Sequence, residues 1–169
     1  GGVCVVWMRV KGGGRGIVGG GGGCAGERTG TGVARRKSSV GIGEAEAAGC
    51  TVSYLTADVA VVRRAERQAG ECVLVHGAAG GVGLAAVDLG NHLGAKVIAT
   101  ASSDAKRAFL KTYGADLVLP SSGFREAVKE ATGGEGANVI YDPVGGDVFD
   151  GSTHCIAFDG RITIIGFTS

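Results

Sequence analysis

The sequence predicts an α/β fold in which helices flank a doubly wound parallel sheet of about five strands. Two observations support this prediction. Short apolar runs rich in β-branched residues alternate with helical patterns over residues 44–169. A glycine-rich turn joins the first of these runs directly to a helix. Residues 1–43, in contrast, have a composition that does not support a packed core.

Residues 1–43 are rich in glycine and contain one strand-like run, Val3–Val10. The glycine tracts at 12–14 and 19–23 lose much backbone entropy on folding and bury no side chains. We therefore expect a low-complexity, disordered segment. The basic cluster Arg35–Lys37 leaves a nucleic-acid-binding arm as an alternative, which the net charge of +1 disfavours.

Composition excludes several classes of protein. With 17 basic and 16 acidic residues, the chain gives no reason to expect a polyanionic partner such as nucleic acid. Five cysteines lie far apart without a Cys-x-x-Cys pair, so we expect free thiols and neither a structural zinc site nor a disulfide framework. No apolar run reaches the ~20 residues that cross a bilayer, so no membrane partner is expected. A reducing, cytoplasmic location is predicted, with a mitochondrial one as the alternative because the sequence does not begin with Met.

Two helical patterns precede the first predicted strand, at residues 44–49 and from residue 52 to about 68. In the second, Ala57, Val61 and Ala65 recur every four positions, as an amphipathic helix requires. The glycine at position 70 ends the helix before the strand.

From residue 72 onward, strands alternate with helices. The predicted strands are residues 72–75, 96–101, 117–119, 138–141 and 161–166, and the predicted helices that follow the second, third and fourth strands are 103–113, 124–132 and 147–158. Ser102 or Ser103 caps the first of these helices, and Gly114 ends it. In such a sheet, the binding crevice lies beyond the carboxyl ends of the first and fourth strands, where the winding reverses.

The turn after the first strand has the pattern Ala78-x-Gly80-x-x-Gly83 and leads straight into a helix. A diphosphate binds exposed N–H groups at a helix N-terminus, where the helix dipole also favours negative charge. Gly80 and Gly81 leave the backbone bare for such a ligand, and Gly83 lets the helix lie close to the strand. The alternative is a structural strand–helix turn that binds nothing.

Two further segments are expected to meet this turn at the crevice. They are residues 142–146, which follow the fourth strand, and residues 166–169, which follow the fifth. Their small residues would permit close approach by a ligand, although turns favour glycine in any case.

The end of the second strand discriminates between two cofactors. An NAD enzyme usually has an acidic residue there to hold the ribose diol. This chain instead has the hydroxyls of residues 100–103, Ser102 among them, followed by Lys106. A 2′-phosphate would be accepted at this place, so NADP(H) is the predicted cofactor. The alternative is that Lys106 belongs to a solvated helix face.

The segments GECVLVHGAAGGVGLAAVDLGNHLGAKVIATASS, YDPVGGDVF and GRITIIGF resemble those of a known family. From about residue 44 to residue 169, the chain is similar to the nucleotide-binding domain of zinc-free quinone oxidoreductases (NADPH:quinone reductases) in the medium-chain dehydrogenase/reductase superfamily. The resemblance implies a Rossmann fold and a two-domain, NADPH-dependent enzyme, usually a homodimer. Such enzymes reduce quinones or α,β-unsaturated carbonyls.

The resemblance also assigns roles by position. Gly80, Gly81 and Val82 would hold the diphosphate, and Lys106 would hold the 2′-phosphate. Thr56 would lie near the nicotinamide. The nicotinamide ring and its ribose would be lined by Val144, Gly166, Phe167 and Ser169. Gly83 and Ser102 complete the expected cofactor site, and no metal ligand is expected.

The chain departs from the family in three respects. Residues 1–43 do not resemble the family's β-rich substrate domain and are too few to form it. The family's sixth strand is missing after residue 169. Pro120-Ser121 also replaces an Asn-Tyr pair whose ring contacts the cofactor in relatives. We therefore expect a fragment, or the product of a truncated or mis-assembled gene model, for which the family's homodimer is doubtful.

The expected function is hydride transfer from NADPH to a quinone or an α,β-unsaturated carbonyl, with this chain as the cofactor-binding part. A catalytically inactive NADP-binding fragment and an enoyl reductase of the same superfamily are the alternatives. No catalytic residue is assigned. Tyr54 is a candidate proton donor, with a packing role favoured. His76, His92 and His154 are scattered, and a catalytic role is disfavoured for each.

Overall fold

The computed structural model describes residues 3–10, 14–21, 35–37, 44–66 and 68–167. The chain divides into two compact units, Gly1–Val52 and Ser53–Ser169. The predicted boundary between residues 43 and 44 stays a prediction.

The first unit contains an antiparallel sheet of three strands in the order β1-β2-β3. These strands are β1 (Val3–Val10), β2 (Gly14–Gly21) and β3 (Arg35–Lys37). The strand-like run predicted at Val3–Val10 is therefore a strand. The predicted flexibility of the segment remains a prediction.

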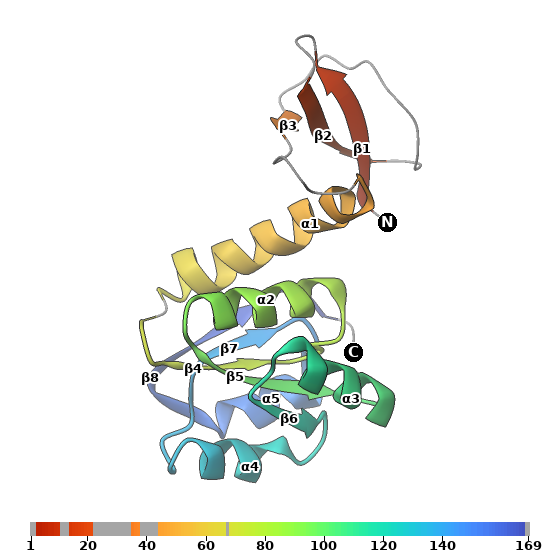
Figure 1. The fold of residues 1–169 in the computed structure, drawn as a ribbon. Coiled ribbons are helices and arrows are strands. Elements are labelled where there is room, and N and C mark those ends of the chain that lie inside the picture. The colour runs from red at the N-terminus through yellow and green to blue at the C-terminus, as the bar shows by residue number, and fades with distance from the viewer. Residues whose placement is uncertain (1–2, 11–13, 22–34, 38–43, 67, 168–169) are drawn as a thin grey trace. The chain divides into compact units, whose positions relative to one another are not determined.

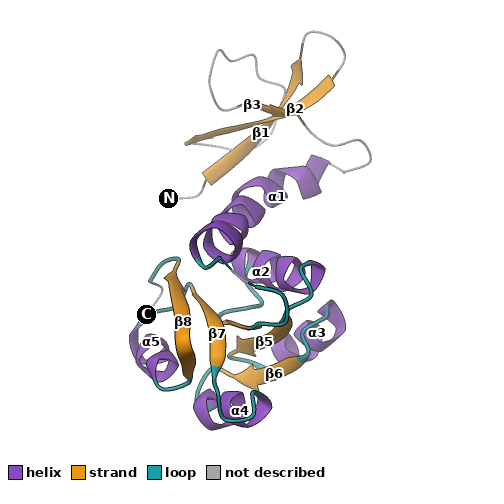
Figure 2. Cartoon of the chain, turned by 90° about the vertical axis from the view of Figure 1, so that its left-hand side faces the viewer, coloured by secondary structure: helices purple, strands orange, loops and turns teal. Residues whose placement is uncertain are grey.

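The second unit is built on a parallel sheet with the strand order β6-β5-β4-β7-β8. Its strands are β4 (Cys72–Val75), β5 (Lys96–Ala101), β6 (Leu117–Pro120), β7 (Ala137–Asp142) and β8 (Ile156–Ile164). The chain first winds from β4 to β5 and β6, then returns to β7 on the other side of β4, so the winding reverses beside β4. Figure 2 shows β7 and β8 at one side of the sheet and β5 and β6 at the other. The predicted doubly wound parallel sheet is confirmed.

Helices cover both faces of this sheet (Figure 1). They are η1 (Asp58–Arg64), which is the π-helical continuation of α1 (Glu44–Ala57), and α2 (Gly81–His92), α3 (Asp104–Tyr113), α4 (Phe124–Ala131) and α5 (Gly146–Thr153). Residues of η1, α2 and α3 pack in one hydrophobic cluster, and residues of α4 and α5 pack in a second cluster. The two clusters lie on opposite faces because successive side chains of each strand point to opposite faces.

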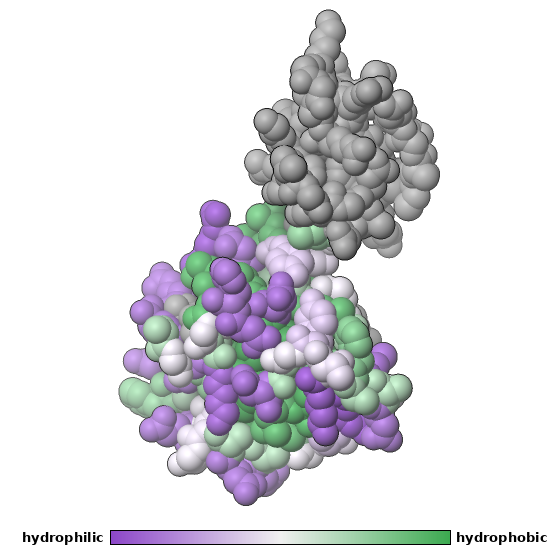
Figure 3. Space-filling view, in the orientation of Figure 1, coloured by the Kyte–Doolittle hydropathy of each residue, from purple (hydrophilic) through white to green (hydrophobic). Residues whose placement is uncertain are grey.

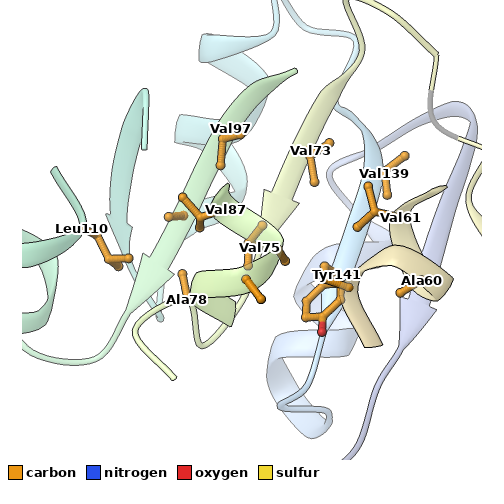
Figure 4. Packing of buried hydrophobic residues seen from close by; sticks show 14 of the residues in the cluster. Ala60, Val61, Val73, Val75, Ala78, Val87, Val97, Leu110, Val139 and Tyr141 are labelled. Carbon is orange, nitrogen blue, oxygen red and sulfur yellow. The ribbon is translucent and has the colours of Figure 1, made fainter. Parts of the chain in front are cut away.

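The larger cluster joins η1, α2 and α3 to the sheet through fully buried side chains (Figure 4). Val73, Val75 and Val97 line the sheet side of this cluster. Tyr141 is fully buried between β7 and the helical turn that carries Ala60. Burial raises the pKa of the Tyr141 hydroxyl to about 12, so this side chain stays neutral in the core.

The face of the second unit seen in Figure 3 mixes hydrophilic and hydrophobic residues. No helix in the described residues is both long enough and apolar enough to span a bilayer.

The sequence prediction is wrong at the last helix and strand. A helix is predicted over 147–158 and a strand over 161–166, whereas α5 ends at Thr153 and β8 runs over Ile156–Ile164. Ile156 pairs with Ala137 of β7, and the Ala137 N–H donates to the carbonyl of Cys155 at 2.9 Å. An apolar run of this length fits either a helix or a buried strand, and pairing with β7 decides in favour of the strand.

The first helices also differ from their prediction. A single helix runs from Glu44 through α1 and η1 to Arg64, instead of two helices of which the second ends near residue 68. The helix stops early because Glu66 adopts a left-handed backbone conformation, with φ of 47°. Elsewhere, Ser103 caps α3 by accepting from the Lys106 N–H, and Gly114 ends it with φ of 118°, as predicted.

An ion pair joins the amino end of β4 to β8. Arg161 donates through Nη2 to both carboxylate oxygens of Glu71, at 2.8 and 2.7 Å. Only 34% of the Arg161 side chain and 15% of the Glu71 side chain are exposed. The pair therefore ties two strands that are 90 residues apart in the sequence.

We predict that Arg161→Ala lowers the free energy of unfolding by about 1–2 kcal/mol, because the Glu71 carboxylate is mostly buried and loses this partner. Urea denaturation with an unchanged m-value measures this loss. Arg63→Ala is the control, since its pair with Asp58 leaves 71% of the Arg63 side chain exposed and should change stability by less than about 0.5 kcal/mol. Equal losses in the two variants would contradict the prediction.

Candidate functional site

The turn after β4 brings the start of α2 against the strand. A Cβ atom at Gly83 would lie 2.6 Å from the carbonyl oxygen of Gly77 and 2.7 Å from Cα of Ala78. No side chain fits at this distance, so the predicted close packing of helix and strand at Gly83 is confirmed. The Ala78 N–H donates to the carbonyl of Thr100 at 3.0 Å, which ties the turn to the end of β5.

The first turn of α2 presents bare backbone. Gly80 and Gly81 are exposed, and Gly80 caps the helix without a side-chain hydrogen bond. The first N–H groups of an α-helix have no acceptor within the helix. The amides of Gly81, Val82 and Gly83 occupy these positions, and the helix dipole adds positive potential there. The Val82 side chain packs against the larger hydrophobic cluster.

A cavity of about 280 Å³ lies beside this turn, at the carboxyl ends of the central strands. It is lined by Gly77, Ala79, Gly80, Thr100, Ala101, Ser102, Lys106, Ser121, Val144 and Val148. The cavity thus brings together four of the residues that the sequence singles out for the cofactor. These four are Gly80, Ser102, Lys106 and Val144.

The segments after β7 and β8 also meet near the turn. A Cβ atom at Gly77 would lie 3.3 Å from Cγ2 of Val144, and one at Gly145 would lie 2.6 Å from Cδ1 of Phe167. Asp142 shapes this segment, because its Oδ1 accepts from the N–H groups of Val144 at 2.8 Å and Gly145 at 3.0 Å. The expected convergence of the three segments is therefore observed.

Phe167 is 73% exposed beside Gly145, and a Cβ at Gly166 would meet nothing within 4 Å. The space around these two residues is therefore open. Ser169, the last residue expected in the cofactor site, lies outside the described residues.

Two adjacent cations at the start of α3 have different surroundings. Arg107 donates to the carbonyl of Ala101 at 3.0 Å and forms an ion pair with Asp104. Lys106 is exposed at the cavity, and its ammonium forms no ion pair with any residue that the structure describes. Lys106 is therefore the cation at this end of the cavity that can bind an anionic group without breaking an existing pair.

The structure does not bring Thr56 into the cavity. Thr56 instead lines a separate groove of about 540 Å³ together with residues of η1 and β8. The groove is bordered by Leu55, Val59, Ala60, Arg64 and the run from Ile162 to Ile165.

His76, the last residue before the glycine turn, is fully buried. Its Nδ1 lies 2.9 Å from Oγ1 of Thr100, and its Nε2 lies 2.8 Å from Oγ of Ser152. Burial lowers the pKa of His76 to about 4, although the nearby Asp142 opposes this shift. The ring is therefore neutral near pH 7.

The other candidates for proton transfer lie away from the cavity. Tyr54 donates to Oδ2 of Asp88 at 2.6 Å, and this hydrogen bond, together with burial, raises the pKa of Tyr54 well above its usual value. Since Tyr54 also packs against the larger hydrophobic cluster, its geometry favours a packing role. His92 and His154 are both exposed.

Among the residues that the structure describes, no three His, Cys, Asp or Glu side chains lie close enough together to hold a metal ion. These residues do not form a zinc site, and the expectation of a metal-free chain stays a prediction.

The sequence marks Ser121 as a departure from an Asn-Tyr pair that contacts the cofactor in relatives, and Ser121 does line the cavity, since it follows the carboxyl end of β6. Sequence reasoning did not single out Val148, which also lines the cavity. Val148 lies on α5 and carries no sequence signal that separates it from a core residue.

We predict that Gly83→Ala lowers the free energy of unfolding by about 1–3 kcal/mol, because the new methyl group overlaps the backbone of the turn. Gly80→Ala is the matched control. Its Cβ would lie 3.4 Å from the Gly77 carbonyl oxygen, at a backbone φ of −82° that alanine adopts freely. Urea unfolding compares the two variants, and equal stabilities would contradict the close approach at Gly83.

We also predict that stability falls as the pH drops from about 6.5 to about 4. In this window the unfolded chain binds a proton at His76 that the folded chain does not, so a falling pH stabilises the unfolded state relative to the folded state. His76 contributes about 3 kcal/mol to the free energy of unfolding above pH 6.5, and this contribution is lost as the pH falls to about 4. Urea unfolding at stepped pH measures it, with His76→Phe as the reference that lacks this proton. The same pH slope in both proteins would contradict the prediction.

Comparison with known proteins places this site in a family. A family model described as "Zinc-binding dehydrogenase" matches residues 81–169. The quinone oxidoreductase-like protein 2 homolog of Nematostella vectensis is 41% identical over 157 residues, which cover 91% of this chain and 43% of that protein.

Two solved structures share the fold. A mycobacterial protein solved in complex with NADPH is 35% identical, with a TM-score of 0.76 over 80% of this chain and 43% of that one. The CurK enoyl reductase is 33% identical, with a TM-score of 0.75 over 80% of this chain and 41% of that one. This chain thus spans less than half the length of each of these proteins. It belongs to the zinc-binding dehydrogenase family, and within the medium-chain dehydrogenase/reductase superfamily it groups with the quinone oxidoreductases.

Proposed function

We propose that this chain forms the nucleotide-binding part of an oxidoreductase that uses NADPH to reduce a quinone or an α,β-unsaturated carbonyl. The observation that carries the proposal is the cavity at the glycine turn, which is lined by Gly80 and Lys106 and lies next to the exposed start of α2. The mycobacterial relative solved with NADPH supports the same reading.

The amides of Gly81, Val82 and Gly83 would bind the diphosphate of the cofactor. Close packing at Gly83 fixes the direction of these N–H groups, and the absence of a side chain at Gly80 lets the phosphate oxygens approach. The helix dipole stabilises the negative charge that they carry.

The wall formed by the end of β5 would bind the adenosine ribose. Ser102 and Lys106 lie where an NAD enzyme usually has an acidic residue. A hydroxyl and an unpaired ammonium bind a 2′-phosphate, whereas a carboxylate would repel it. This chemistry favours NADPH over NADH.

The opposite end of the cofactor would extend past Val144 toward Gly166, Phe167 and Ser169. The exposed Phe167 ring beside Gly145 offers an apolar surface for the nicotinamide and its ribose. When bound there, reduced nicotinamide supplies a hydride to the acceptor. The chain's own part is to hold the ring in place and exclude water from it. Thr56 lines a separate groove that reaches Ile165, the residue before Gly166, and its role near the nicotinamide stays a prediction.

The substrate class rests on the relatives. The Nematostella relative is named for quinone oxidoreductases, whereas the CurK structure is that of an enoyl reductase. Reduction of an enoyl thioester is therefore the second candidate function. A chain that binds NADPH without turnover is the third.

We predict that Lys106→Met weakens NADPH binding about 10-fold and leaves NADH binding unchanged, because only NADPH carries the 2′-phosphate. Isothermal titration calorimetry measures both affinities. Lys111→Met, in the last turn of the same helix, is the control and should match the wild type. An equal loss for both dinucleotides would overturn the role of Lys106, and a wild-type chain that binds neither would overturn the proposed function.

Steady-state oxidation of NADPH then separates the candidate activities. Turnover with a small quinone supports the quinone reductase, and turnover with an enoyl thioester alone supports the enoyl reductase. Tight NADPH binding without turnover on either acceptor supports the inactive nucleotide-binding chain.

A further inference from the structure

His76 lies at the centre of a buried hydrogen-bond network directly under the cavity. Its ring nitrogens contact Thr100 of β5 and Ser152 of α5, and its ring packs edge-on against Phe124 with 4.8 Å between the ring centroids. The backbone N–H of His76 donates to the carbonyl of Tyr141 at 3.0 Å. One residue thus links β4 to β5, β7 and α5.

The partners fix which ring nitrogen carries the hydrogen. The Ser152 hydroxyl donates to the carbonyl of Val148 at 2.7 Å, which uses its single hydrogen. Ser152 must therefore accept from His76, so Nε2 carries the hydrogen. In the neutral ring, Nδ1 then has none and accepts from the hydroxyl of Thr100. Burial, which lowers the pKa of His76 to about 4, is consistent with this neutral form.

Both partners belong to the walls of the cavity. Thr100 lines the cavity and stands two residues before Ser102, at the end of the strand that leads to Lys106. Ser152 holds the carbonyl of Val148, which lines the opposite wall. His76 itself has no exposed surface and cannot touch a ligand in the cavity.

We infer that His76 is a positioning residue, whose two ring hydrogen bonds hold the β5 wall and the α5 wall of the nucleotide cavity at the spacing that the adenosine phosphate end of the cofactor requires. This inference rests on the proposed function. It assigns His76 no proton transfer. A ring that bridges two walls by opposite hydrogen bonds, one donated and one accepted, fixes their spacing more narrowly than apolar packing does.

Three substitutions separate the two hydrogen bonds. His76→Phe keeps the ring volume and the contact with Phe124 but removes both bonds. His76→Asn places an amide oxygen near the position of Nδ1, where it can still accept from Thr100. His76→Gln places an amide nitrogen near Nε2, where it can still donate to Ser152.

The probe is 2′,5′-ADP, which carries the adenosine and both phosphates of this end of the cofactor. Binding is measured by calorimetry at pH 7.5 on variants whose folding is verified by circular dichroism and urea unfolding. We expect His76→Phe to weaken binding about 10-fold. His76→Asn, which retains the bond to the phosphate-bearing wall, should recover more affinity than His76→Gln. His92→Gln, an exposed histidine on α2, should bind like the wild type.

Nitrogen-15 NMR of the imidazole in the wild-type chain tests the network without any substitution. We expect the hydrogen on Nε2, both with and without 2′,5′-ADP. A hydrogen on Nδ1 would overturn the inference. So would a folded His76→Phe variant that binds 2′,5′-ADP as tightly as a binding-competent wild type, while the proposed function would stand. A wild type that binds neither 2′,5′-ADP nor NADPH would instead overturn the proposed function itself.

Discussion

The start of α2 lies closer to the tip of β4 than any side chain would permit. At Gly83, a single methyl group would overlap the backbone of Gly77 and Ala78, so the helix reaches its position only because that carbon is absent. This contact sets where the first amides of α2 point. The turn is held from the other side as well, since the Ala78 N–H binds the carbonyl of Thr100. The close approach at Gly83 and the hydrogen bond from Ala78 to Thr100 together determine the shape of the cavity.

The reversal of winding at β4 explains why the cavity lies there. The chain leaves β4 toward β5 on one side and returns to β7 on the other, so the loops after these strands diverge above the sheet. Small residues line the space that this divergence leaves. The buried His76 then joins the two diverging sides from below, through Thr100 and Ser152. The position of the cavity therefore depends on the strand order, and the spacing of its walls depends on the His76 side chain.

Local patterns predict those parts of the fold that local chemistry determines. The bounds of β4 and β5 follow from short apolar runs flanked by polar or glycine residues, and α3 follows from its Ser103 cap and Gly114 stop. The sequence pattern does not locate the end of α5 and the start of β8, because Ile156 is a strand residue only through its pairing with Ala137. The sequence around His76 does not reveal its role, because the partners of its ring lie 24 and 76 residues away.

The same distinction between local and distant contacts decides the electrostatics of the cavity. Lys106 and Arg107 are adjacent cations in the sequence, but the start of α3 gives their side chains different partners. Ser103 caps α3 by accepting from the Lys106 N–H, and the Arg107 guanidinium turns back to Asp104 and the carbonyl of Ala101. Arg107 is thereby occupied in holding the end of β5 to α3, which leaves Lys106 at the cavity. A cation that already has partners contributes less to ligand binding than one without an ion pair among the described residues, so under the proposed function the start of α3 leaves Lys106 rather than Arg107 to bind the 2′-phosphate.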